Sequence, residues 1–168
     1  VHLEPISAYS KKVKNLKDLK DGATVLASSN TPDYGRILTI LQDAGLIKVK
    51  KGIDITTANF SDITSNPRHL KFKHSYEPKL MPSIYKNGEG DVDFINANYA
   101  VQSGLDPRKD AIVTEKSSSP YVNIVAVRKG DQKKPAIKKL MKALQSKSTQ
   151  KWIYNHYKGA VLPAKSYK

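Results

Sequence analysis

Arg36 is the residue whose type and position most clearly allow chemistry in this sequence. It lies beside Gly35, in the first turn of a helix that the pattern of residues 31–45 predicts. The first turn of a helix leaves backbone N–H groups unpaired and carries a partial positive charge. A guanidinium there adds a planar, permanently charged partner for a carboxylate or a phosphate. The position favours an anion-binding site, with an exposed arginine that binds no ligand as an equal alternative.

Three asparagines lie where predicted strands begin or end. Asn96 and Asn98 stand at the transition from a buried strand to a helix, and Asn123 interrupts the apolar run "YVNIVAV". In parallel α/β sheets ligands bind at the carboxyl ends of the strands, and an amide inside an apolar strand needs a hydrogen-bond partner. Position alone favours a helix cap for Asn98 and leaves Asn123 balanced between a local bond and a ligand. Asn96 receives no role beyond support of the loop.

The patterns of common enzymes and metal sites are missing. There is no G-x-S-x-G nucleophile elbow, no H-E-x-x-H pair and no P-loop. The four histidines are scattered without a carboxylate at metal-ligand spacing, and the sequence has no cysteine. We therefore expect no enzymatic activity, no catalytic residue, no metal site and no cofactor.

Strands and helices are predicted to alternate along the chain. The patterns predict strands over 23–27, 53–57, 70–76, 91–97, 111–115 and 121–128, and helices over 31–45, 80–90, 98–104, 134–146 and 148–159, while 59–67 forms at most a short helix. Thr31, Pro32 and Asp33 suit the start of the 31–45 helix, and Gly45 suits its end. This alternation is typical of an α/β fold with a largely parallel sheet.

One imbalance divides the chain. The last two helices and the strand over 121–128 are apolar enough to need a sheet of their own, and residues 1–10 supply only the strand "ISAY" for it. We therefore expect one complete α/β lobe and a fragment of a second.

The formal charge of +14 is typical of a protein that binds nucleic acid. Only four of the 29 basic residues are arginines, and the lysines occur along the whole chain. Proteins that recognise bases and phosphates favour bidentate arginine contacts and aromatic side chains on which bases stack. A solvated lysine surface is therefore the favoured interpretation. A basic surface protein that binds nucleic acid or another anionic polymer is the alternative, and attraction to an anionic membrane is a secondary consequence.

Five blocks of sequence give the chain a resemblance to a known family. They are "HLEPISAYSKKVKNLKDLKDGATV", "SNTPDYGRILTILQDAGLIKVK", "VDFINANYAVQSGLDPRKDAI", "SSPYVNIVAVRKGDQKKPAIKKLMKALQS" and "YKGAVLPA". In this order they resemble the methionine-binding lipoprotein family, the substrate-binding components of methionine ABC importers, and the resemblance covers essentially the whole chain. It implies a periplasmic-binding-protein-like (type II) two-lobed fold: residues 11–119 would form the second lobe, and residues 1–10 and 120–168 the hinge strands and the C-terminal part of the first.

The resemblance also implies a function and a site. It implies capture of L- or D-methionine, or of a related amino acid or dipeptide, and delivery to an ABC permease and ATPase, with no nucleic acid as partner. It implies Arg36 on the ligand carboxylate, Asn98 and Asn123 at the ligand head group, and Asn30 and Tyr34 along the same loop. Cationic forks and amide oxygens are what a zwitterionic amino acid needs.

Two departures from the family pattern qualify these expectations. Family members carry a signal peptide, a lipidated cysteine and a further N-terminal segment before "HLEP", so we expect an extracytoplasmic protein that is lipid-anchored at the cell surface or in the periplasm through a segment absent here. We expect the 168 residues alone to bind methionine poorly. The loop "SSNTPDYGR" replaces a Pro-Asn-Asp-Pro-Thr-like loop, which leaves the side-chain specificity open.

Overall fold

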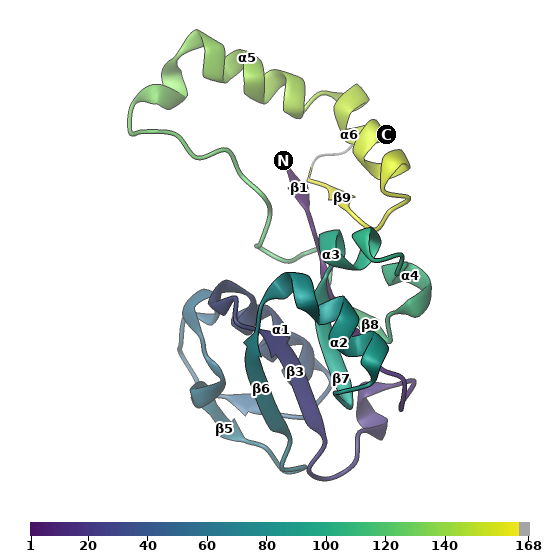
Figure 1. Cartoon of the computed structure of the whole chain (residues 1–168). Coiled ribbons are helices and arrows are strands. Elements are labelled where there is room, and N and C mark those ends of the chain that lie inside the picture. The colour runs from purple at the N-terminus through teal and green to yellow at the C-terminus, as the bar shows by residue number, and fades with distance from the viewer. Residues whose placement is uncertain (165–168) are drawn as a thin grey trace. The chain divides into compact units, whose positions relative to one another are not determined.

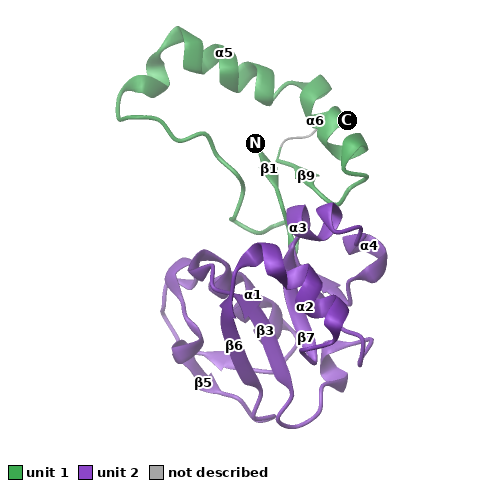
Figure 2. Cartoon of the chain, viewed as in Figure 1, with its two compact units in different colours: residues 1–5, 116–168 green, residues 6–115 purple. Residues whose placement is uncertain are grey.

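The chain forms two compact units, which Figure 2 shows in separate colours. The computed structural model describes residues 1–164. Unit 1 combines Val1–Pro5 with the segment that begins at Lys116, and unit 2 comprises Ile6–Glu115.

A mixed five-stranded sheet forms the centre of unit 2 (Figure 1). Its strands, in spatial order, are β6 (Lys71–Tyr76), β3 (Thr24–Ser28), β7 (Val92–Asn96), β2 (Ile6–Tyr9) and β8 (Val113–Thr114). Strand β3 is parallel to β6 and β7, whereas β2 is antiparallel to β7 and β8. A separate antiparallel pair joins β4 (Lys48–Val49) to β5 (Ile63–Ser65).

Helices cover both faces of this sheet. The α-helices of unit 2 are α1 (Tyr34–Asp43), α2 (Met81–Asn87), α3 (Ala97–Gln102) and α4 (Pro107–Asp110), and 3-10 turns occupy Leu16–Asp18, Thr31–Asp33, Ile55–Thr57, Phe60–Asp62 and Pro78–Leu80. Helix α1 packs Ile37, Leu38 and Leu41 into the larger core, together with residues of β2, β3 and β7. A smaller core on the other side of the strands contains Met81 and Ile84 of α2. The three central strands, β3, β7 and β2, are therefore buried on both faces, whereas the edge strand β6 is largely exposed.

The α/β prediction is confirmed, but local predictions for unit 2 need correction. Residues 55–57 form a 3-10 turn rather than a strand, because the Asp54 carboxylate accepts hydrogen bonds from the Thr56 amide (2.9 Å) and hydroxyl (2.7 Å). The 59–67 segment contains the predicted short helix, the 3-10 turn Phe60–Asp62, but its residues Ile63–Ser65 form the unpredicted strand β5. The strand "ISAY" pairs with β7 and β8 in unit 2 and not with the apolar segments near the C-terminus, so the sheet is mixed rather than largely parallel.

Among its described residues, unit 1 contains two α-helices, a 3-10 turn and one short strand pair. Strand β1 (His2–Leu3) is antiparallel to β9 (Leu162–Pro163), the 3-10 turn Asp131–Lys133 precedes α5 (Pro135–Leu144), and α6 (Lys147–His156) follows. Both predicted helices are therefore present. Helix α6 buries Gln150, which donates hydrogen bonds to the carbonyl oxygens of Leu144 (2.7 Å) and Val1 (3.2 Å).

The predicted strand over residues 121–128 is absent. The segment has no regular secondary structure, and the Ile124 side chain is 77% exposed. Its backbone makes a single strand-like contact, in which the Asn123 amide donates to the His2 carbonyl (2.7 Å) while the Val1 amino group reaches the Asn123 carbonyl. A strand requires a continuous partner for its N–H and C=O groups, and no strand of the described residues 1–164 pairs with this apolar segment.

The positive charge is concentrated in unit 1. Its segments contain 13 lysines and arginines against two acidic residues, Glu4 and Asp131, whereas unit 2 contains 16 against 13. The formal excess is therefore +11 in unit 1 and +3 in unit 2. Basic residues occur in both units, but acidic residues come close to balancing them only in unit 2.

Candidate functional site

The carboxyl ends of β3 and β7 bring polar residues to one edge of the sheet in unit 2. Because these two strands are parallel neighbours, the loop after Ser28 and the residue Asn96 lie at the same edge. The antiparallel strand β2 begins at this edge, since Ile6 pairs with Asn96. Strand β8 ends there, and Glu115 follows it, with its amide donating to the Ile6 carbonyl (2.9 Å).

Arg36 is held at this edge by two carboxylates. Its Nε donates to both carboxylate oxygens of Glu115 at 3.1 Å, its Nη2 donates to Oε2 of the same residue, and its Nη1 donates to Asp33 Oδ1 at 3.0 Å. Arg36 is only 8% exposed. Burial by itself lowers the pKa of Arg36, but the hydrogen bond and charge of Glu115, and then of Asp33, raise it above its ordinary value.

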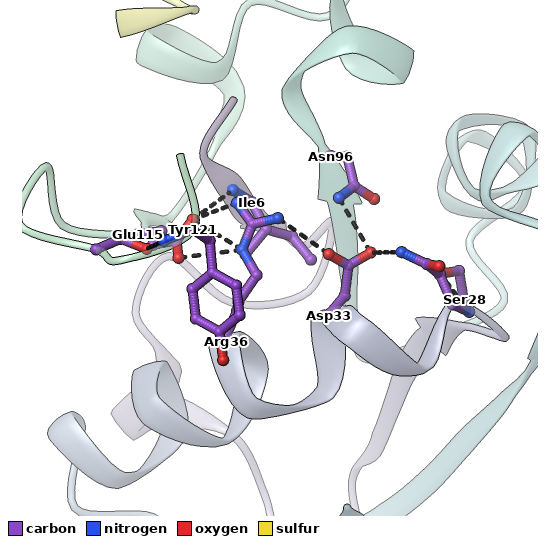
Figure 3. Close-up of polar contacts among 9 residues, drawn as sticks. Ile6, Ser28, Asp33, Arg36, Asn96, Glu115 and Tyr121 are labelled. Carbon is purple, nitrogen blue, oxygen red and sulfur yellow. Dashed lines mark hydrogen bonds and ion pairs between the residues drawn. The ribbon is translucent and has the colours of Figure 1, made fainter. Parts of the chain in front are cut away.

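Asp33 connects Arg36 to two amides. Its Oδ2 accepts hydrogen bonds from Asn30 Nδ2 (2.7 Å) and Asn96 Nδ2 (3.1 Å), and Figure 3 shows Asn96 and Arg36 directed at the same carboxylate. Asp33 occupies the N-cap position of α1 but makes no side-chain capping bond, because its oxygens are used here. We call Asn30, Asp33, Arg36, Asn96 and Glu115 the polar edge.

The other predicted site residues have different surroundings. Tyr34 is buried, its Oη lies 3.0 Å from His74 Nδ1, and its ring packs against Phe60 with centroids 4.7 Å apart. Asn98 is the second residue of α3, half-buried, and its side chain makes no hydrogen bond to another described residue. It is therefore not the helix cap that position favoured: Asn96 occupies the N-cap position, also without a side-chain capping bond.

Asn123 belongs to unit 1 and is exposed. Of the five predicted site residues, Asn30 and Arg36 are the two that share a hydrogen-bond network, through Asp33. Sequence reasoning missed Asp33 and Glu115 as members of this network. A signal for Asp33 was present, since it precedes Arg36 by three residues and so shares its helix face. Glu115 ends the predicted strand "AIVTE", but nothing local connects it to Arg36, 79 residues earlier.

The described residues contain no cluster of three or more His, Cys, Asp or Glu side chains that could hold a metal ion. Among them, too, no helix combines the length and apolar character that crossing a bilayer requires.

Comparisons with known proteins agree with the resemblance. Residues 1–165 match the family model of the NlpA lipoproteins. The chain is 48% identical over 164 residues to the methionine-binding lipoprotein MetQ of Bacillus subtilis, a match that covers 97% of this chain and 60% of that protein. It is 39% identical to the D-methionine-binding lipoprotein MetQ of Salmonella typhimurium, covering 84% of this chain and 52% of the relative.

Two solved structures share the fold. One is a nutrient-binding protein from Burkholderia cenocepacia bound to methionine, with a TM-score of 0.86, 37% identity, and coverage of 98% of this chain and 68% of that one. The other is a periplasmic substrate-binding protein of an ABC transporter from Coxiella burnetii, with a TM-score of 0.84, 36% identity, and coverage of 97% and 67%.

By fold, the chain is of the α/β substrate-binding type. It spans about 60% of the length of its Bacillus subtilis relative. The chain belongs to the NlpA lipoprotein family.

Proposed function

We propose that the protein captures methionine outside the cytoplasm and delivers it to an ABC importer. The observation that carries this proposal is the match to a relative whose solved structure is bound to methionine. The polar edge of unit 2 supports it, because a guanidinium and two amides are groups that hold the charged ends of an amino acid. In this structure the Arg36 guanidinium donates to Glu115 and Asp33, so a ligand carboxylate would compete with these two side chains. The names of the relatives support methionine over other amino acids.

We further propose roles for the predicted site residues. Arg36 would contact the ligand carboxylate, Asn98 and Asn123 the ligand head group, and Asn30 and Tyr34 would line the same loop. The Asn98 side chain has no hydrogen-bond partner among residues 1–164, which supports its assignment, since a half-buried amide gains from a ligand that supplies one.

The remaining parts of the proposal concern organisation and partners. Residues 11–119 would form the second lobe, and residues 1–10 and 120–168 would belong to the hinge and the first. An ABC permease and its ATPase would receive the ligand, and an N-terminal lipid anchor would hold the protein at the membrane. The membership in a lipoprotein family supports the anchor and the extracytoplasmic location.

Calorimetric titration of the full-length protein tests this function. L-methionine, D-methionine and a methionine dipeptide are compared with leucine and glutamine, and a thermal melt is recorded with each. A ligand that binds only the folded state raises the melting temperature with concentration. Methionine or one of its close relatives should bind and stabilise most strongly; equal responses to all compounds, or none, would contradict the proposal.

The charge of unit 1 favours a second candidate, a surface that binds an anionic polymer. Thirteen basic residues against two acidic ones create a field that attracts polyanions. Retention on heparin that falls steeply with salt, in a protein that does not respond to methionine, would favour this function over transport.

A further inference from the structure

Asp33 has a larger role than the helix-dipole partner that its position in the sequence predicts. The Asp33 side chain is 6% exposed, and its carboxylate accepts hydrogen bonds from three side chains. One oxygen receives Arg36, and the other receives both Asn30 and Asn96. A single buried group therefore fixes the direction of three side chains that come from a loop, a helix and a strand end.

This arrangement determines which atoms the two amides offer to a ligand. An ionised carboxylate only accepts hydrogen bonds, so each amide must direct its NH2 group at Asp33. The carbonyl oxygen at the other end of each amide accepts no hydrogen bond from another described residue. Asn30 is exposed and Asn96 is half-buried. Both oxygens are acceptors held in fixed directions.

The charges of the polar edge point to the same kind of ligand. Asp33 and Glu115 are two carboxylates, and Arg36 is the one guanidinium that lies between them. The three buried groups thus carry a formal excess of one negative charge. A cation placed beside buried carboxylates is stabilised by their charge.

We propose that Asp33 makes the polar edge selective for a ligand that carries an ammonium group. It does so as a positioning residue, by directing the carbonyl oxygens of Asn30 and Asn96 outward, and it contributes the negative charge that the ammonium balances. A primary ammonium has three N–H donors, which two amide oxygens satisfy in part. This inference rests on the proposed function, because it concerns the amino group of the captured amino acid.

The test measures a preference rather than an affinity. Full-length wild-type protein and Asp33→Asn are titrated with L-methionine and with 4-(methylthio)butanoate, which lacks only the ammonium group. The wild type should bind methionine more tightly than the analogue. Asp33→Asn should reduce this ratio of affinities about tenfold or more, because the loss of a hydrogen bond to a charged group changes affinity by about this factor. Asp43→Asn makes the same change of charge at an exposed position of the same helix and should leave the preference unchanged.

A second variant distinguishes selectivity from a general loss of structure. Asn96→Ser removes one amide and keeps Asp33, and it should lower the preference in the same direction by a smaller factor. If both variants weaken the two ligands equally, or leave the ratio of affinities unchanged, Asp33 has only a structural role and the inference is overturned.

The inference and the proposed function fail in different ways. If another amino acid binds better than methionine, methionine is wrong as the ligand, and the same comparison with that amino acid and its desamino analogue decides the role of Asp33. If the wild type binds desamino acids as well as amino acids, the inference fails while the transport function stands. A protein that binds neither overturns both.

Discussion

Replacement of Asp93 by Asn is expected to remove a pH-dependent loss of stability from unit 2. Asp93 lies on β7, is 2% exposed, and its buried Oδ1 has no hydrogen-bond partner among the described residues. Its cross-strand neighbour, Tyr9 on β2, likewise buries an unpaired hydroxyl. Burial first, then the negative charge of Glu89, raise the pKa of Asp93 to about 7, against the opposing charge of Lys12.

The size and sign of the effect follow from this pKa. The ordinary value for the carboxyl is 3.8, so the folded protein binds the proton of Asp93 more tightly than the unfolded chain does. Its contribution to stability is therefore fully present below about pH 4, falls as the pH rises toward 7, and is lost above that. Three pH units at about 1.4 kcal/mol each give an upper limit of about 4 kcal/mol. Asparagine does not ionise, so this dependence should vanish.

Hydrogen exchange of the β2 and β7 amides is the suitable assay, since the single tryptophan, Trp152, lies in unit 1 and reports on that unit. Protection is compared at pH 5 and pH 8, with exchange rates corrected for their intrinsic dependence on pH. The wild type should lose protection at pH 8, and Asp93→Asn should not. An equal loss in both proteins would refute the reasoning.

Asp91 provides a matched control with the opposite sign. The hydrogen bond from Lys12 (2.8 Å) and then that from the Thr24 amide (2.7 Å) lower the pKa of the Asp91 carboxyl. Its contribution to stability is thus present above the ordinary carboxyl pKa and lost as the pH falls through the lowered one. Asp91→Asn should therefore reduce protection at pH 8, where Asp93→Asn increases it.

Three further perturbations test other features. Glu115→Ala should destabilise unit 2 by about 1–3 kcal/mol in urea denaturation, because it removes the acceptor of the Arg36 Nε and Nη2 groups while Asp33 still balances the charge; the absence of a measurable cost would show that the pair is not buried in solution. Gly90→Ala should cost about 1–3 kcal/mol in the same assay, since an added Cβ would overlap Asp93 Oδ1 and lie 2.9 Å from a Leu26 side-chain carbon; an unchanged midpoint would contradict this close approach. Because unit 1 carries a large positive charge, the protein should elute from heparin at a higher salt concentration than a variant in which the α5 lysines are replaced by glutamine. Elution of both proteins at the same salt concentration would show that this charge has no role in binding heparin.

Local signals predicted the helices better than the strands. Pro32 and Gly45 bracket the helix that the structure shows as a 3-10 turn followed by α1, and Gly88 ends α2 in a left-handed conformation (φ 74°). These signals act through the backbone of a few neighbouring residues, so the sequence contains them. Strands depend on partners elsewhere in the chain, which explains why the apolar segment 121–128 was predicted as a strand that the structure lacks.

The polar edge was predictable in part for the same reason. The positions of Arg36 at a helix start and of asparagines after a strand are local features. They are sufficient to predict a polar site at this edge of the sheet. The partner Glu115 could not be predicted without the fold, because it is brought to Arg36 by the pairing of β8 with β2. The Asn96 side chain makes no capping bond to α3, and its NH2 group donates to Asp33, 63 residues earlier in the chain. No local sequence rule predicts this partner.

The two ends of unit 2 lie next to each other in the sheet. The Glu115 amide donates to the Ile6 carbonyl at 2.9 Å, and the Ile6 amide donates to a Glu115 carboxylate oxygen at 3.2 Å. A domain whose ends meet can be inserted into a surface loop of another protein without stretching its host. The ends of residues 6–115 therefore meet the geometric condition for insertion into a host loop.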